Sequence, residues 1–147
     1  MNRPPSVEGV RQSLRAHLAA KGAEIHRKYG PHIGWDELVE LLKDPDCVRY
    51  PCEIRFDAGP LLAGELAHPA AKGKRPEEGF TLFVHPGLAT QLSEVPLAAL
   101  YQLVVVNYGN FVSAEDAETF GCHALGLSQD DYYQALCKLA DQIDGVK

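Results

Sequence analysis

Residues 97–108 read LAALYQLVVVNY, and this stretch decides the fold of the chain. Its apolar side chains recur every three or four residues, so that one helical face consists of Leu97, Leu100, Tyr101, Val104, Val105 and Tyr108. Alanine, leucine and valine make the other faces apolar too, which predicts a helix at the buried centre of the fold. The valines at 104–106 have a low helix propensity and leave a strand as the alternative there. The spacing and the preceding Pro96 favour the helix.

Upstream of this helix, the period of the apolar residues changes from that of a helix to that of a strand. A half-buried strand is predicted over residues 50–56, with inward side chains at Tyr50, Cys52, Ile54 and Phe56. Two more strands are predicted at residues 61–68 and 80–85. Between them, residues 69–79 combine charged side chains with proline and glycine, which indicates an exposed loop. Pro51 has no N–H to donate, so we expect its strand to lie at a sheet edge.

Helices are expected on both sides of the strands. The first begins after Ser6, a suitable capping residue, and ends at residues 29–31, and a shorter one follows over residues 35–42. Beyond the central helix, one helix near residues 114–125 stops at Gly126, and a last one carries Tyr132, Leu136, Leu139 and Ile143. The order ααβββααα predicts an α+β fold with about five helices and a small three-stranded, mostly antiparallel sheet.

The whole chain, residues 1–147, is predicted to be one domain, because its length is close to the commonest size for a single hydrophobic core. This domain comprises an N-terminal helical segment, a β-sheet segment and a C-terminal helical segment, at residues 1–45, 46–86 and 87–147.

The composition is typical of a globular protein, with 46% apolar and 23% charged residues. No apolar run approaches the roughly 20 residues that span a bilayer, so we expect no membrane partner. The four cysteines lack the paired spacing of a secreted disulfide scaffold. The N-terminus lacks the apolar core of a secretory signal. We therefore predict a cytoplasmic protein.

The net charge of −6 is unevenly distributed. Residues 1–30 carry six basic and two acidic side chains, whereas residues 93–147 carry two basic and eight acidic ones. Nucleic-acid binding usually needs a clustered basic face on a basic domain, so we predict no nucleic-acid partner. Solvated helix faces explain the asymmetry most simply, and head-to-tail self-association is the alternative.

The common catalytic motifs are missing from the sequence. The chain has no glycine-rich P-loop, no G-x-S-x-G and no Cys-x-x-Cys, so we assign no catalytic residue and expect no cofactor. Cys122 and His123 are neighbours on a predicted helix and point about 100° apart, a poor arrangement for a thiolate and its base.

Polar residues on the buried helix are the more informative candidates, because a buried amide must find partners or face water. If the fold has a pocket, we expect it around Gln102 and Asn107 on this helix. Glu118 on the following helix, and His85 near the same end of the sheet, complete the candidate pocket.

Cys52, His68 and His85 are weak candidates for a zinc site, because zinc prefers cysteine and histidine ligands. An antiparallel hairpin across the 69–79 loop would place His68 opposite residue 80 and His85 opposite residue 63. The two histidines would then lie about 17 Å apart along the sheet. One metal ion cannot contact both, so we predict no metal site and interpret each histidine as an ordinary strand-end residue.

The second half of the chain, over about residues 48–125, resembles small zincin-type metalloproteins. Strands lead into the buried helix and then into the segment Ala117-Glu118-Thr119-Phe120. In that family the buried helix carries H-E-x-x-H, whose histidines bind zinc, and a later helix often supplies a glutamate through a similar segment. Only Glu118 matches, because no histidine occurs between His85 and His123. The resemblance implies a metal-free relative that has lost peptidase activity.

Two functions from different classes remain. The abundant apolar helix faces, the charge asymmetry and the lack of a catalytic constellation predict a noncatalytic protein-interaction or oligomerisation module, with a second copy or another protein as partner. The alternative is a small-molecule or enzymatic pocket built around residues 97–108.

Overall fold

The computed structural model describes residues 7–144 of the chain. Its helices are α1 (Val7–Tyr29), α2 (Trp35–Leu41), α3 (Val95–Tyr108), α4 (Ala114–Leu125) and α5 (Gln129–Asp144). Its strands are β1 (Cys52–Phe56), β2 (Ala67–Ala71) and β3 (Phe80–Val84). The predicted α+β class and the order ααβββααα are confirmed. The expected capping residue Ser6 lies outside the described residues.

The sheet has the strand order β1-β3-β2, so β3 is its central strand. β1 pairs with β3 in parallel, whereas β2 pairs with β3 in antiparallel. The prediction of a mostly antiparallel sheet is therefore wrong for one of the two strand pairs, and the sheet is mixed. β1 is an edge strand, as expected, but it begins at Cys52, so that Pro51 lies just before the strand and not inside it. The Pro51 carbonyl accepts a hydrogen bond from the Phe80 amide at 2.8 Å.

β2 is displaced from its predicted position. It spans Ala67–Ala71 rather than residues 61–68, so that Pro69 lies inside the strand, opposite Leu82. The sheet tolerates this proline because β2 is an edge strand. The predicted register is wrong for the same reason: His68 pairs with Phe83, close to His85, and the two histidines do not lie at opposite ends of a long hairpin.

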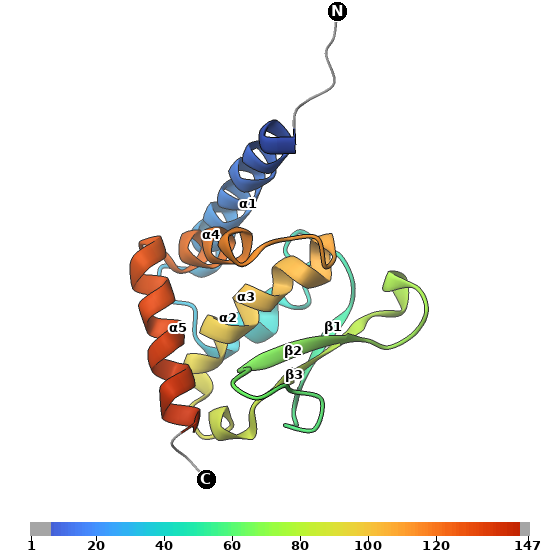
Figure 1. Ribbon diagram of the computed structural model, residues 1–147, viewed down its shortest axis with the longest axis vertical. Helices are drawn as coiled ribbons and strands as arrows, with labels where there is room; N and C mark the ends of the chain where they lie inside the picture. The colour runs from blue at the N-terminus through green and yellow to red at the C-terminus, as the bar shows by residue number, and fades with distance from the viewer. Residues whose placement is uncertain (1–6, 145–147) are drawn as a thin grey trace, which may run out of the picture.

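α3 is the buried centre of the fold, as predicted. Leu100, Leu103 and Val104 are completely enclosed, and the helix begins at Val95, two residues earlier than expected. Figure 1 shows α3 between the sheet on one side and α1, α4 and α5 on the others. A helix with neighbours on so many sides has no solvent-exposed stripe, which explains why its sequence is apolar all round.

The remaining helices follow their local signals. Ser113 caps α4 by accepting a hydrogen bond from the Asp116 amide at 3.2 Å, and Gly126 ends the helix in a left-handed conformation with φ of 69°. α1 packs along α4, and its N-terminal end extends beyond the body of the molecule (Figure 1). Within residues 7–144, no helix is both long enough and apolar enough to cross a membrane.

Candidate functional site

Hollows open beside α3 in the described part of the chain. The first, called the α5 hollow, lies between α3, α4 and α5, has a volume of about 280 Å³, and includes Tyr101, Gln102, Glu118, Tyr133 and Cys137. The second, called the α1 hollow, lies between α1 and the C-terminal end of α3, has a volume of about 250 Å³, and includes His17, Lys21, Arg49, Asn107 and Tyr108.

The predicted pocket residues are divided between these places. Gln102 and Glu118 lie together in the α5 hollow, whereas Asn107 lines the α1 hollow. Asn107 follows Gln102 by five residues and therefore points about 140° further round the helix. His85 lines neither hollow, and its Nδ1 atom accepts a hydrogen bond from the Gly87 amide at 3.0 Å.

The walls of the α5 hollow are mainly apolar, with polar groups at a few points. Tyr133 is 51% exposed although it lines the hollow. The neighbouring Cys137 thiol raises the pKa of Tyr133. Burial, followed by the nearby Glu118 charge, raises the pKa of Tyr101. Within the described residues, the Gln102 and Glu118 side chains form neither ion pairs nor hydrogen bonds, so their polar groups are available to a ligand.

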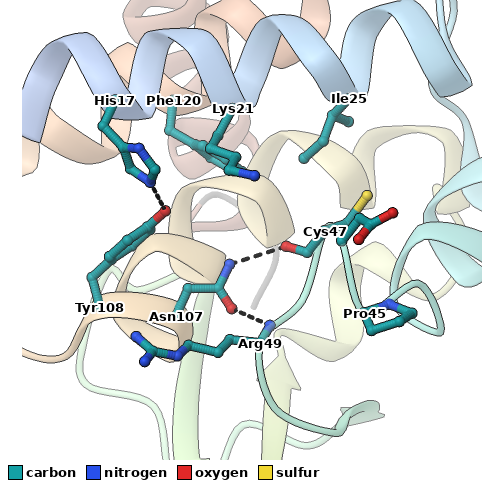
Figure 2. Close-up of a pocket in the computed structure, with 10 residues that line it drawn as sticks. His17, Lys21, Ile25, Pro45, Cys47, Arg49, Asn107, Tyr108 and Phe120 are labelled. Carbon is teal, nitrogen blue, oxygen red and sulfur yellow. Dashed lines mark hydrogen bonds between the residues drawn. The ribbon is translucent and has the colours of Figure 1, made fainter.

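The α1 hollow is shaped by a buried amide. Asn107 is 8% exposed, and its Nδ2 atom donates to the Cys47 carbonyl at 3.0 Å. Its Oδ1 atom accepts a hydrogen bond from the Arg49 amide at 2.8 Å (Figure 2). The two bonds join α3 to a segment 58 and 60 residues earlier in the chain, and this anchoring places Arg49 at the hollow.

The opposite wall of the α1 hollow comes from α1. His17 Nε2 and the Tyr108 hydroxyl oxygen are 2.8 Å apart, with their rings packed edge to face (Figure 2). Lys21 extends from the same helix into the hollow. Burial raises the pKa of Tyr108, and the positive charges of Lys21 and Arg49 act in the opposite direction. The charges of both cations therefore act on the same hydroxyl.

The weak zinc candidates do not converge. Cys52 is aligned with Phe80 on β3 and His68 with Phe83, an odd number of residues further on, so their side chains lie on opposite faces of the sheet. Burial also raises the pKa of the Cys52 thiol to about 11, which disfavours the thiolate that zinc needs. Across residues 7–144, no group of three histidine, cysteine or acidic side chains could hold a metal ion.

Cys122 and His123 contact each other, with Sγ and Nδ1 separated by 3.5 Å. However, the same Nδ1 atom lies 2.8 Å from the Thr119 carbonyl, which can only accept a hydrogen bond. Nδ1 must therefore carry the proton in that bond and cannot take one from the thiol. Burial raises the pKa of Cys122, which also opposes a reactive thiolate.

Several residues of the two hollows carry no clear functional signal in the sequence. His17, Lys21 and Arg49 lie on surface positions whose patterns indicate only solvated helix or strand faces. Tyr133 is exposed, whereas the preceding Tyr132 is fully buried. The sequence does not show which of these two neighbouring tyrosines is exposed, because their exposure depends on how α5 packs.

Comparisons with known proteins add no assignment: no family model, no curated protein and no solved structure matches this chain. The resemblance to zincin-type metalloproteins therefore stays a prediction. Its one matching residue, Glu118, lies beside Tyr101 and Gln102 of α3.

Proposed function

We propose that the protein is a noncatalytic interaction module whose α5 hollow binds an apolar, positively charged segment of a partner protein in the cytoplasm. The observation that carries this proposal is an open, mainly apolar hollow that has an exposed tyrosine and a carboxylate without a partner among the described residues.

The apolar part of the hollow supports a macromolecular ligand. Ala98 of α3, Ala114 of α4 and Ala140 of α5 are small, so the helices leave a shallow depression between them. Tyr133 stands at its edge with half of its surface exposed. Tyrosine is enriched at protein interfaces because it offers a large apolar area with a polar tip.

The charge around the hollow indicates the chemistry of the partner. Glu118 and Asp130 lie close to Tyr133 at the rim, and residues 93–147 carry eight acidic and two basic side chains. A lysine or arginine on the partner would compensate Glu118, whereas an acidic segment would be repelled. This complementarity favours a basic apolar segment as the occupant.

The binding test uses a designed peptide of about 12 residues, long enough to cover the two turns of α5 that line the hollow. A fluorescent amphipathic leucine–lysine helix is titrated with the full chain and followed by anisotropy. We expect a dissociation constant of roughly 10–100 μM, corresponding to about 5.5–6.8 kcal/mol of binding free energy. A leucine–glutamate counterpart should bind at least tenfold more weakly.

Two pairs of variants locate the binding site. Tyr133→Ala and Glu118→Lys should each weaken binding about fivefold or more, because they remove the exposed ring and reverse the rim charge. Phe111→Ala and Glu40→Lys are matched controls, since they change an exposed aromatic and an exposed acid outside the hollow. Equal binding of the two peptides, or equal effects of variants and controls, would contradict the proposal.

Light scattering on the free protein distinguishes a second copy from a separate partner. A concentration-dependent dimer that Tyr133→Ala disrupts would assign the α5 hollow to self-association, and the proposal of a separate basic partner would then be wrong. A monomer that still binds the leucine–lysine peptide supports it.

A further inference from the structure

The α1 hollow offers chemistry that the proposed interaction function does not use. It lies at the other end of α3 and shares no lining residue with the α5 hollow. Two of its lining residues are cations, Lys21 and Arg49, although the whole chain carries a net charge of −6. With Asp46 as the acid among its lining residues, the hollow has a net positive charge on an acidic protein.

Arg49 is the most available of these cations. It is exposed and forms no ion pair with any residue in the described part of the chain, and its guanidinium lies 5.6 Å from the centre of the Tyr50 ring. Lys21 has one acidic neighbour, Glu24, on its own helix at 3.4 Å. Asp46 is the acid among the lining residues, and its ion-pair contact is with Lys28, at 4.0 Å.

The two cations are held on opposite walls. Lys21 comes from α1 above the hollow in Figure 2, and Arg49 comes from the segment below it. The Asn107 side chain fixes the Arg49 backbone, while the contact between His17 and Tyr108 joins α1 to α3. The positions of both walls are therefore set by contacts that exist without a ligand, which reduces the ordering cost of binding.

An apolar hollow adjoins the cationic one. It has a volume of about 420 Å³, shares Arg49, Asn107 and Tyr108 with the α1 hollow, and is lined further by Tyr50 and Phe80. The rings of Tyr50 and Phe80 are 6.1 Å apart at their centroids. A ligand that places an anionic group near Arg49 can therefore bury an apolar or planar part against these rings.

We propose that the α1 hollow binds a small organic anion, whose carboxylate or phosphate group lies between Lys21 and Arg49 and whose apolar part packs toward Tyr50 and Phe80. Arginine suits such a group because its planar guanidinium can donate two hydrogen bonds to a carboxylate or phosphate at once. The Tyr108 hydroxyl offers a further polar contact.

The experiment is an NMR titration of the ¹⁵N-labelled full chain with phenyl phosphate, benzoate, inorganic phosphate and benzyl alcohol. We expect saturable shifts of the backbone amides of Lys21, Arg49 and Tyr108 with phenyl phosphate, benzoate or both. The tighter of these two identifies the preferred anionic group. Benzyl alcohol, which lacks the charge, should bind at least tenfold more weakly than the better anion.

Variants test the two cations separately. Arg49→Gln and Lys21→Gln should each weaken binding of the better anion by roughly tenfold, because each removes a charge-assisted contact. Arg55→Gln and Lys43→Gln are matched controls at exposed positions that line neither hollow, and they should leave the affinity unchanged. Glu118→Lys should also leave it unchanged, which separates this site from the α5 hollow.

Three outcomes would overturn the proposal. The first is no saturable shift with either organic anion. The second is that benzyl alcohol or inorganic phosphate binds as tightly as the better organic anion. Equal affinity for benzyl alcohol would show that the charge has no role, and equal affinity for inorganic phosphate would show that the apolar part has none. The third is unchanged affinity in both Arg49→Gln and Lys21→Gln.

Discussion

Asn107 shows how one buried polar side chain can organise a site. An asparagine near the end of an apolar helix would be costly if its amide had no partners. Here it bonds to the Cys47 carbonyl and to the Arg49 amide, and so satisfies two backbone groups that are not paired within a sheet or helix. The residue therefore acts on the backbone of a distant segment and, through it, on the position of Arg49.

Replacing this amide should destabilise the fold. Asn107→Ala leaves the Cys47 carbonyl and the Arg49 amide without their partners, and we expect a loss of about 2 kcal/mol in the free energy of unfolding. Urea denaturation followed by circular dichroism measures it. Asn110→Ala, at an exposed position just beyond the same helix, is the control and should change stability by less than about 0.5 kcal/mol. Equal effects of the two variants would show that the amide contributes no more than a surface residue.

At the scale of the elements, α1 and α4 pack closely against each other. Gly22 of α1 is buried there, and a Cβ atom at this position would lie 2.5 Å from the Phe120 carbonyl oxygen and 3.1 Å from the Ala124 amide nitrogen. These are backbone atoms of a helix and cannot move aside independently. The glycine weakens α1 as an isolated helix, but it allows the two helices to approach each other.

Gly22→Ala separates these two effects. Helix propensity alone predicts a gain of about 1 kcal/mol for alanine. The clash with the α4 backbone predicts a loss, and we expect the clash to dominate with a net cost of about 2 kcal/mol. Thermal and urea unfolding of the variant give the sign directly. Ser13→Ala, at an exposed position on the same helix, should be nearly neutral, and a stabilised Gly22→Ala protein would contradict the packing argument.

At the scale of the whole molecule, two carboxylates of other segments bind α1 through ion pairs and hydrogen bonds, one toward each end of the helix. Toward its N-terminus, the buried Asp116 lies 3.3 Å from both Arg11 Nη1 and Arg15 Nε. Toward its C-terminus, Asp44 accepts hydrogen bonds from Lys28 and from the Tyr29 hydroxyl, the latter at 2.7 Å.

Both carboxyl groups favour the ionised form in the folded protein. Hydrogen bonds from Lys28 and Tyr29 hold the pKa of Asp44 well below its usual range. Burial of Asp116 acts to raise its pKa, but the hydrogen bonds from Ser113 and the contact with Arg15 outweigh it, so that the pKa is lowered. A folded-state pKa below the unfolded value stabilises the fold above the unfolded pKa of about 4, and this stabilisation is lost as the pH falls further.

The pH dependence of one variant pair tests this attachment of α1. At about pH 7, Asp44→Asn should be less stable than the unmodified protein by roughly 1 kcal/mol or more, since it weakens charge-assisted hydrogen bonds. The difference should shrink as the pH falls below about 4. Urea unfolding at a series of pH values measures it. Asp46→Asn is the control, because Asp46 is largely exposed and contacts Lys28 only at 4.0 Å. A difference that persists undiminished at about pH 2 would contradict the linkage.

The candidate site was only partly predictable, and the residues show why. Gln102 is conspicuous in the sequence as a polar group on a buried helix, and Glu118 is the residue that matches the zincin-like segment; the two share a hollow. Asn107 was identified for the same reason as Gln102 but faces a different hollow. Lys21 and Arg49 carried no local signal, since each is an ordinary basic residue until the fold places them on opposite walls of one hollow.

The sequence by itself determined the helices, including the buried α3, the cap at Ser113 and the stop at Gly126, because helix hydrogen bonds and caps connect residues within about one turn. Only the tertiary structure decided that β1 and β3 run parallel and that β2, with the sequence Ala-His-Pro-Ala-Ala, completes the sheet. Strand pairing joins residues far apart in the chain, and a segment with weak strand propensity takes its conformation from its partner. The two hollows arise in the same way, from the spaces that remain when distant helices pack around α3.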